Sequence, residues 1–347
     1  MKINAAGLVL CSFLIGCGSG DAPFGNDATE GDGGSEDGGT IGSDGSLPPG
    51  TASPSPDTTI FRKEARDESG NGFAEGVRYN SENDTFIVDN LPFDGTAEEP
   101  YTRGVAVGSL GDYAVYEAPA VITDPDNADS QISQLRHRAI YGVSRTGNTE
   151  FAIVRTGDYV NYGFGGFVYE RNGSVTLPTT GQALYNGKGA GLRDYTNRGG
   201  LEYSTADVQI AIDFDDFNAS TGTTEGAVDG FVFNRRVFDL SGNEITNDII
   251  GRINEGNNAS LSAIPTAVFS IGVNALDENG EINGNLTSRF ANDSGNPVVY
   301  EEGTYYGILS GDNAEELVGI IVLESTVDPT ADSVRDTLGF TIYREAR

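Results

Sequence analysis

The sequence predicts an all-β protein: a small β-rich handle domain followed by an eight-stranded antiparallel up-and-down β-barrel, preceded by a disordered tether. Three observations lead to this prediction. The 347 residues include 48 Gly and 13 Pro, which is typical of many short turns between strands. Apolar residues alternate with period two in short runs from about residue 59 onward, and no helical stripe extends over three turns. Residues 18–57, ahead of these runs, contain too few apolar residues to fold.

Charge and composition exclude several classes of protein. Asp and Glu number 52 and Lys and Arg 21, which gives a formal net charge of −31. This balance argues against nucleic acid as a partner and against docking on anionic lipid through a basic face, because both need clustered cations. One His and two Cys leave little for zinc cages, iron–sulfur clusters or His-based catalysis. We therefore expect no enzyme activity, no metal and no cofactor.

Residues 1–16 are predicted to be a lipoprotein signal peptide. Lys2 precedes an apolar stretch, residues 5–15, that is too short to span a bilayer. The stretch ends in Leu-Ile-Gly-Cys, which resembles the bacterial lipobox and makes Cys17 the predicted lipid-attachment residue. The alternative is an ordinary secretory signal in which Cys17 has no role. Because Cys11 lies in the removed segment, the mature chain would contain no disulfide.

Residues 17–57 are predicted to be a disordered Gly/Asp/Ser-rich tether. Residues 18–57 contain eleven Gly, eight acidic residues and no Lys or Arg. Such a segment cannot bury enough apolar surface to offset the ordering of its backbone, and a flexible coil of this length reaches roughly 35 Å. Calcium binding by the Asp/Gly tract is the alternative, but the fixed nonapeptide spacing of calcium-binding β-rolls is missing.

The handle domain is assigned to residues 58–179. Period-two runs rich in β-branched and aromatic residues predict its strands. These runs are 85–89, 111–117, 139–143, 150–154 and 166–169. A polar break is expected at 123–130, and 131–138 is the one stretch where we expect a short helix or turn.

The barrel is assigned to residues 180–347. Its eight strands are expected to start near Gln182, Val208, Gly226, Ala267, Glu281, Gly303, Val318 and Gly339. The even spacing favours an up-and-down barrel, in which closure removes the exposed sheet edges, and small residues at alternate positions suit an interior filled by side chains. A β-sandwich also fits the periodicity. Residues 277–280, Asp-Glu-Asn-Gly, predict a hairpin turn and not a calcium loop, since Ala275 and Leu286 stand where its first and twelfth ligands belong.

The second half contains a further pattern in segments 183–187, 208–215 and 226–232, and in 307–322 with 339–344. Its motif residues are Gly307, Gly311, Asn313, Ala314, Glu315, Glu316, Leu317, Gly319, Gly339 and Phe340. This pattern resembles the barrels of transferrin-binding protein B-like surface lipoproteins: the first three segments are similar to the first three barrel strands, and the last two to the closing motif.

This resemblance implies a lipid-anchored protein of the Gram-negative outer membrane, exposed at the cell surface. Members bind iron carriers, haem carriers or complement regulators, so it also implies a protein or haem-carrier ligand and a part in iron or haem acquisition. An outer-membrane receptor or a lipoprotein translocon is an implied partner. The sequence departs from the best-characterised members by having one short handle and one barrel, and their ligand-contacting loops have no matching motif here.

Three groups of residues are weighed as candidate sites. Arg136, His137 and Arg138 form the one dense basic cluster and are candidates for ligand contact, against the alternative that they pair with neighbouring acids. Asp213 and Asp215 are expected on one strand face with Asp216 opposite, as a carboxylate pair for hydrolysis or calcium, or as solvated acids at the barrel rim. A third group is an aromatic-rich stretch, expected to be core and otherwise a contact surface. It comprises Tyr159, Tyr162, Phe164, Phe167 and Tyr169.

The leading functional hypothesis is an outer-membrane-anchored surface lipoprotein that binds a protein or small solute non-covalently. A structural coat protein with no specific ligand is the alternative, because the high negative charge alone supplies hydration and repulsion. An exposed apolar patch larger than a few hundred Å² would favour the first hypothesis, and a uniformly polar surface would favour the coat. An enzyme built on the three aspartates is a third hypothesis.

Overall fold

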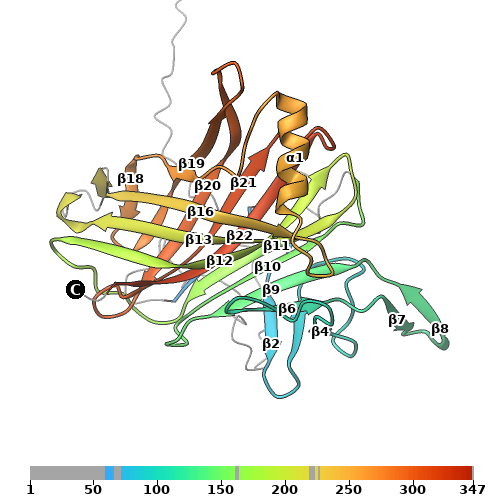
Figure 1. Ribbon diagram of the computed structural model, residues 1–347. Helices are drawn as coiled ribbons and strands as arrows, with labels where there is room; N and C mark the ends of the chain where they lie inside the picture. The colour runs from blue at the N-terminus through green and yellow to red at the C-terminus, as the bar shows by residue number, and fades with distance from the viewer. Residues whose placement is uncertain (1–58, 66–71, 161–163, 219–222, 226, 346–347) are drawn as a thin grey trace, which may run out of the picture.

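The computed structural model describes residues 59–345, except 66–71, 161–163, 219–222 and 226. The predicted signal peptide, Cys17 and the tether lie outside the described residues. Within the described part the protein is all-β, with one α-helix, a curled sheet and a closed barrel (Figure 1). The predicted fold class is therefore confirmed.

The first sheet corresponds to the predicted handle. Among the described residues it has nine strands, in the order β1-β11-β10-β9-β6-β4-β3-β2, with β5 paired to β6. Their bounds are β1 (Ile60–Lys63), β2 (Val77–Asn80), β3 (Thr85–Val88), β4 (Tyr101–Arg103), β5 (Ser109–Leu110), β6 (Tyr113–Glu117), β9 (His137–Val143), β10 (Thr149–Thr156) and β11 (Gly165–Arg171). The hairpin of β7 (Val121–Asp124) and β8 (Asn127–Ser133) connects β6 to β9 and projects away from the ends of these two strands (Figure 1).

The second sheet closes on itself. Its ring, within the described residues, has eight antiparallel strands in sequence order, because β19 pairs with β20 and β22 pairs with β12. The ring strands are β12 (Gln182–Thr196), β13 (Leu201–Asp213), β16 (Val228–Phe238), β17 (Ala267–Phe269), β19 (Glu281–Ala291), β20 (Pro297–Ser310), β21 (Glu316–Ser325) and β22 (Ser333–Arg344). The short segments η1 (Phe214–Asp216), β14 (Phe217–Asn218), β15 (Thr223–Glu225) and β18 (Val273–Asp277) extend one end of the wall. Closure decides the architecture in favour of the barrel over the sandwich.

The handle sheet is buried on both faces. One face packs on the barrel wall in a shared core that includes Phe151 and Phe167 from the handle and Leu192 and Ile320 from the barrel. The other face, with Phe86, packs under the curl of its own sheet. Handle and barrel are thus joined through a continuous apolar core.

The barrel interior divides into an apolar and a charged half. Apolar side chains such as Tyr185, Ile210 and Phe340 fill the half nearest the β20–β21 turn. Toward the other end, the buried Arg235 guanidinium pairs with Glu301 and with Asp336, whose carboxylate also accepts a hydrogen bond of 2.6 Å from the Ser204 hydroxyl. Four strands meet in this network.

The charged half explains where the predicted strand starts were wrong. Three strands begin earlier than expected, at Leu201, Pro297 and Ser333. Their first residues include Glu202, Glu301 and Asp336, which are buried inside the barrel. Period-two hydrophobicity cannot reveal an inward-facing residue that is charged, because only the paired partner on another strand makes its burial tolerable.

Of the two alternatives predicted for 131–138, the helix is wrong and a tight turn is present, in which the His137 N–H donates to the Leu135 carbonyl at 2.9 Å. Those residues end β8 and begin β9, where Leu135 donates its N–H to the Phe93 carbonyl and backbone pairing continues. The expected polar break at 123–130 is likewise part of the β7–β8 hairpin. The α-helix that the structure does describe is α1 (Thr246–Asn257), at one end of the barrel (Figure 1).

Helix α1 escaped sequence analysis because it is short. Its apolar contacts come mainly from Ile249, Ile250 and Ile253. These residues cover less than three helical turns, which is too short for an apolar stripe to be recognised in the sequence. These residues pack with Val237 and Tyr300 at the barrel end. Tertiary burial, and not intrinsic propensity, therefore stabilises this helix.

Candidate functional site

The predicted closing motif forms a tight turn between β20 and β21. Gly311 has φ +101° and Ala314 has φ +51°, a left-handed conformation that is uncommon for a residue with a Cβ. The Tyr185 hydroxyl donates to the Ala314 carbonyl at 2.5 Å, and the Arg344 guanidinium donates to the Asn313 carbonyl at 2.8 Å. The turn is thus bonded to the first and the last strand of the barrel, at the point where the ring closes.

Two acidic residues of the motif have different roles. The Glu315 carboxylate accepts the Asn313 N–H at 3.1 Å and so stabilises its own turn. Glu316 is buried and faces the handle, where its two carboxylate oxygens accept the hydroxyls of Thr149 at 2.6 Å and Thr146 at 3.0 Å. Glu316 therefore fastens the barrel to the turn between β9 and β10.

The motif glycines permit close packing. A Cβ on Gly319 would lie 2.2 Å from the Tyr306 carbonyl oxygen and 2.5 Å from Phe340, and one on Gly307 would lie 3.0 Å from Leu317. A Cβ on Gly339 would lie 2.2 Å from the ring of Phe151, a handle residue. The motif residues described here build the barrel and its joint with the handle, and they bring no reactive groups together.

The basic cluster at 136–138 pairs with nearby acids. Arg136 forms an ion pair with Asp158 at 2.7 Å, and Arg138 lies 3.5 Å from the Glu117 carboxylate. His137 is fully buried, and its ring lies beside that of Tyr101, with 6.5 Å between the ring centroids. Burial lowers the pKa of His137 to about 4, so its imidazole is neutral at pH 7. The cluster presents no free cation or imidazole at the surface of the described part.

The expectation that Asp213 and Asp215 share a strand face is wrong. Strand β13 ends at Asp213, and Asp215 lies in the 3-10 helix η1. The Asp213 carboxylate accepts the Asp215 N–H at 3.0 Å and the Gln182 side-chain amide at 2.7 Å. The side chain of Asp216 lies outside the described residues. The two described aspartates act within a local turn, which corresponds to the rim interpretation.

The aromatic stretch divides between core and surface. Phe167 and Tyr169 are buried in the core shared by handle and barrel, whereas Tyr159 is 36% exposed and contacts Phe164 edge-on. Tyr162 lies outside the described residues.

Residues 277–280 form the expected turn, because the Asp277 carboxylate accepts the N–H groups of Asn279 and Glu281 at 2.9 Å.

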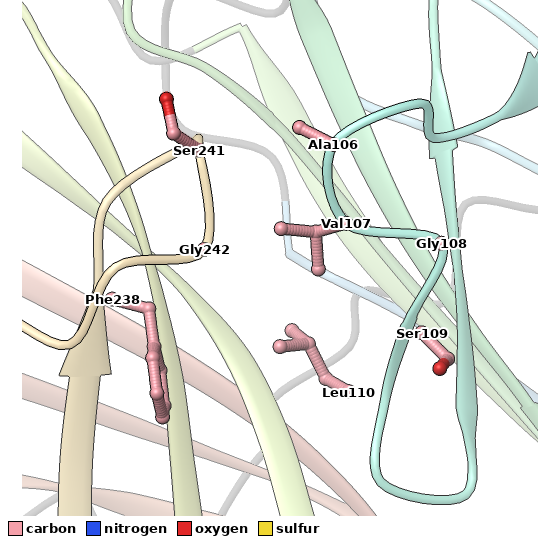
Figure 2. A pocket seen from close by; sticks show the side chains of 8 residues that line it. All are labelled: Ala106, Val107, Gly108, Ser109, Leu110, Phe238, Ser241 and Gly242. Carbon is pink, nitrogen blue, oxygen red and sulfur yellow. The ribbon is translucent and has the colours of Figure 1, made fainter.

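A cavity that the sequence analysis missed lies at the joint of handle and barrel. It has a volume of about 410 Å³ and lies between the handle loop 104–110 and the barrel turn after β16. Figure 2 shows Val107 and Leu110 pointing toward Phe238 and the Gly242 turn. The lining residues are Ala106, Val107, Gly108, Ser109, Leu110, Phe238, Ser241 and Gly242.

The segment that lines this junction cavity is preceded by an exposed valine. Val105 is 93% exposed, more than any other large apolar residue of the described part. The signal in the sequence is Gly-Val-Ala-Val-Gly at 104–108, an apolar run between glycines that belongs to no strand. Val107 and Leu110 are buried in the core that handle and barrel share, so Val105 and Ala106 are the exposed apolar residues of this segment.

In the part of the chain that the structure describes, no three His, Cys, Asp or Glu side chains are grouped so that they could hold a metal ion. None of the helical residues described forms a segment long and apolar enough to cross a membrane.

Fold and joint together define a class: an all-β protein with a curled handle sheet fastened to a closed eight-stranded barrel. No family model matches the chain, and no curated protein matches it. The solved structures that it resembles include a mutant transferrin-binding protein B from Haemophilus parasuis, at 12% identity and a TM-score of 0.35, over 78% of this chain and 44% of that one. Intact Ap-TbpB is similar at 13% identity and a TM-score of 0.35, over 83% and 52%. A protein described as a surface lipoprotein matches at 14% identity and a TM-score of 0.28, over 59% and 80%.

The chain spans about half, or less, of the length of the transferrin-binding protein B chains that it matches.

Proposed function

We propose that this protein is an outer-membrane-anchored surface lipoprotein, held by lipid on Cys17, whose handle-and-barrel body binds another molecule non-covalently and without catalysis. The anchor rests on the lipobox-like sequence at 14–17 and the acidic tether after it. A role in iron or haem acquisition, with a carrier protein as ligand, is what the sequence resemblance implies.

The observation that carries the binding proposal is the open junction cavity, which is lined by residues of both the handle and the barrel. The barrel interior is filled by its own apolar and charged side chains, so recognition belongs on the outer surface. The cavity joins a handle loop to a barrel turn and has the volume of a typical binding site. Four of its lining residues, Ala106, Val107, Leu110 and Phe238, have apolar side chains.

The same observation favours binding over the coating alternative. A coat that acts by charge and hydration needs no cavity formed jointly by a handle segment and a barrel turn. The formal charge of −31 is compatible with both functions and so does not decide between them.

A pull-down tests this proposal. Intact cells that produce the tagged full chain are crosslinked, and co-purifying proteins are compared between wild type and Val105→Asp, which places a charge next to the lining segment 106–110. The matched control is Val143→Asp, at a residue that is 44% exposed and lines no part of the cavity. We expect one partner to be lost in Val105→Asp and kept in Val143→Asp. Equal recovery in all three would contradict recognition at the junction.

A further inference from the structure

A second cavity, in the handle, contains a buried carboxylate, Asp94, next to the buried Tyr101. It has a volume of about 250 Å³ and is formed by the end of β3, the loop 89–100 and the start of β4. The lining residues include Arg78, Asp89, Asp94, Thr96, Ala97 and Tyr101. Its volume is below that of a typical site for a small-molecule cofactor, and it suits a single side chain.

Asp94 is the unusual member of this lining. Its side chain belongs to a residue that is 7% exposed, and its Oδ2 accepts the Tyr101 hydroxyl at 3.0 Å. Asp94 forms no ion pair with a cation among the described residues. Arg78 is the one basic residue in the lining, and its guanidinium pairs with the Asp89 carboxylate at 3.2 Å. A carboxylate kept in a cavity without a cation is costly to the fold, which is common where a ligand supplies the missing charge.

The surroundings of the cavity would attract a cation. The loop contributes Asp89, Asp94, Glu98 and Glu99, and the projecting β7–β8 hairpin adds further acids. The hairpin lies against the loop, since Thr123 donates its N–H to the Glu99 carboxylate at 2.9 Å. The acids of the hairpin are Asp124, Asp126 and Asp129. A focused negative field of this kind raises the local concentration and association rate of cationic ligands.

The loop and the hairpin that carry these acids also carry exposed apolar side chains. Phe93 is 55% exposed and holds φ +56°, and Val121 on the hairpin is 41% exposed. Exposed aromatic and aliphatic groups next to a charged cavity are typical of a surface that binds protein, because the apolar groups supply area and the charge supplies specificity.

We propose that this handle cavity binds the ammonium group of a lysine side chain on a basic protein partner, with Asp94 as acceptor and Phe93 as the neighbouring apolar contact. Lysine fits better than arginine because a guanidinium pairs best with two free carboxylate oxygens, and Tyr101 already occupies one of them. This inference rests on the proposed function and names the chemistry of its partner.

Fluorescence anisotropy tests the inference with the full chain in detergent. The probe is a fluorescein-labelled peptide in which lysine alternates with leucine, compared with the same peptide carrying acetyl-lysine at each lysine. Asp94→Asn keeps an acceptor for Tyr101 and removes the charge, while Asp126→Asn removes the same charge outside the cavity. Ala97→Leu, at an exposed lining residue, narrows the cavity without touching any acid.

We expect Asp94→Asn and Ala97→Leu to weaken binding of the lysine peptide at least tenfold, and Asp126→Asn to change it less than twofold. The acetyl-lysine peptide should not bind. The inference is overturned if Asp94→Asn and Asp126→Asn weaken binding equally, if the acetylated peptide binds as well, or if spermidine binds more tightly than the peptide. If the peptide does not bind but the pull-down recovers a partner, this inference alone is contradicted. If the pull-down recovers no partner, the proposed function is contradicted.

Discussion

Phe151 of the handle packs directly on the backbone of Gly339 in the last barrel strand, so closely that a methyl group on residue 339 would lie 2.2 Å from its ring. The two residues belong to β10 and β22, which are far apart in the sequence. Gly339, a residue of the closing motif, is therefore also a point at which the handle packs on the barrel. A residue larger than glycine at position 339 would therefore disturb the packing of the handle on the barrel.

Gly339→Ala should destabilise the protein by about 2 kcal/mol, because the added methyl group overpacks the joint. Urea unfolding measures the change. In a double-mutant cycle with Phe151→Ala, the combined loss should be smaller than the sum of the single losses, since the smaller side chain makes room. Gly251→Ala in α1 is the matched control: its Cβ meets nothing within 4 Å, so it should be neutral or stabilising. Additive losses at 339 and 151 would contradict the contact.

Glu316→Ala should lower the free energy of unfolding by about 1 to 3 kcal/mol. The substitution leaves the Thr149 hydroxyl, which is fully buried, without the carboxylate that accepts its hydrogen bond. Glu324→Ala removes an acid of the same strand whose side chain is 60% exposed, and it should change stability by less than about 0.5 kcal/mol. Similar losses in both variants, measured by chemical denaturation, would show that Glu316 does not fasten the handle.

Arg235→Met should destabilise the barrel by about 3 to 5 kcal/mol, because Glu301 and Asp336 would remain buried without their cation. The adjacent Arg236 has a side chain that is 63% exposed, so Arg236→Met should have an effect within about 0.5 kcal/mol of zero. Thermal unfolding followed by circular dichroism compares the two. A stable Arg235→Met protein would mean that the charged half of the interior tolerates the loss of its central cation.

Glu170→Gln should stabilise the protein at high pH. Burial raises the pKa of Glu170 to about 8, and the Glu150 carboxylate on the paired strand adds to the shift. Because the pKa is raised in the folded state, the free energy of unfolding falls as pH rises from about 4.5 to 8. The variant should lack this decline and gain roughly 2 to 4 kcal/mol above pH 8, with no gain at pH 4. Glu98→Gln, at an exposed site, should keep the wild-type pH profile; an unchanged profile in Glu170→Gln would refute the assignment.

The sequence predicts the strands and the barrel because their residues alternate between a buried and a less buried face. It missed the places where burial depends on a partner elsewhere in the chain. The early starts of β13, β20 and β22 are invisible without the Arg235 network, and α1 depends on packing against Val237 and Tyr300. The candidate sites show the same limit: nothing local at Phe93 and Asp94 indicates that Tyr101 and the β7–β8 hairpin surround them.

Lipid attachment at Cys17 is the claim on which the proposed location and function depend. Cells producing the wild-type chain, Cys17→Ala or Cys11→Ala are labelled with radioactive palmitate, and the purified protein is counted. The account predicts label in wild type and Cys11→Ala and none in Cys17→Ala. An unlabelled wild-type protein, or label that persists in Cys17→Ala, would contradict it.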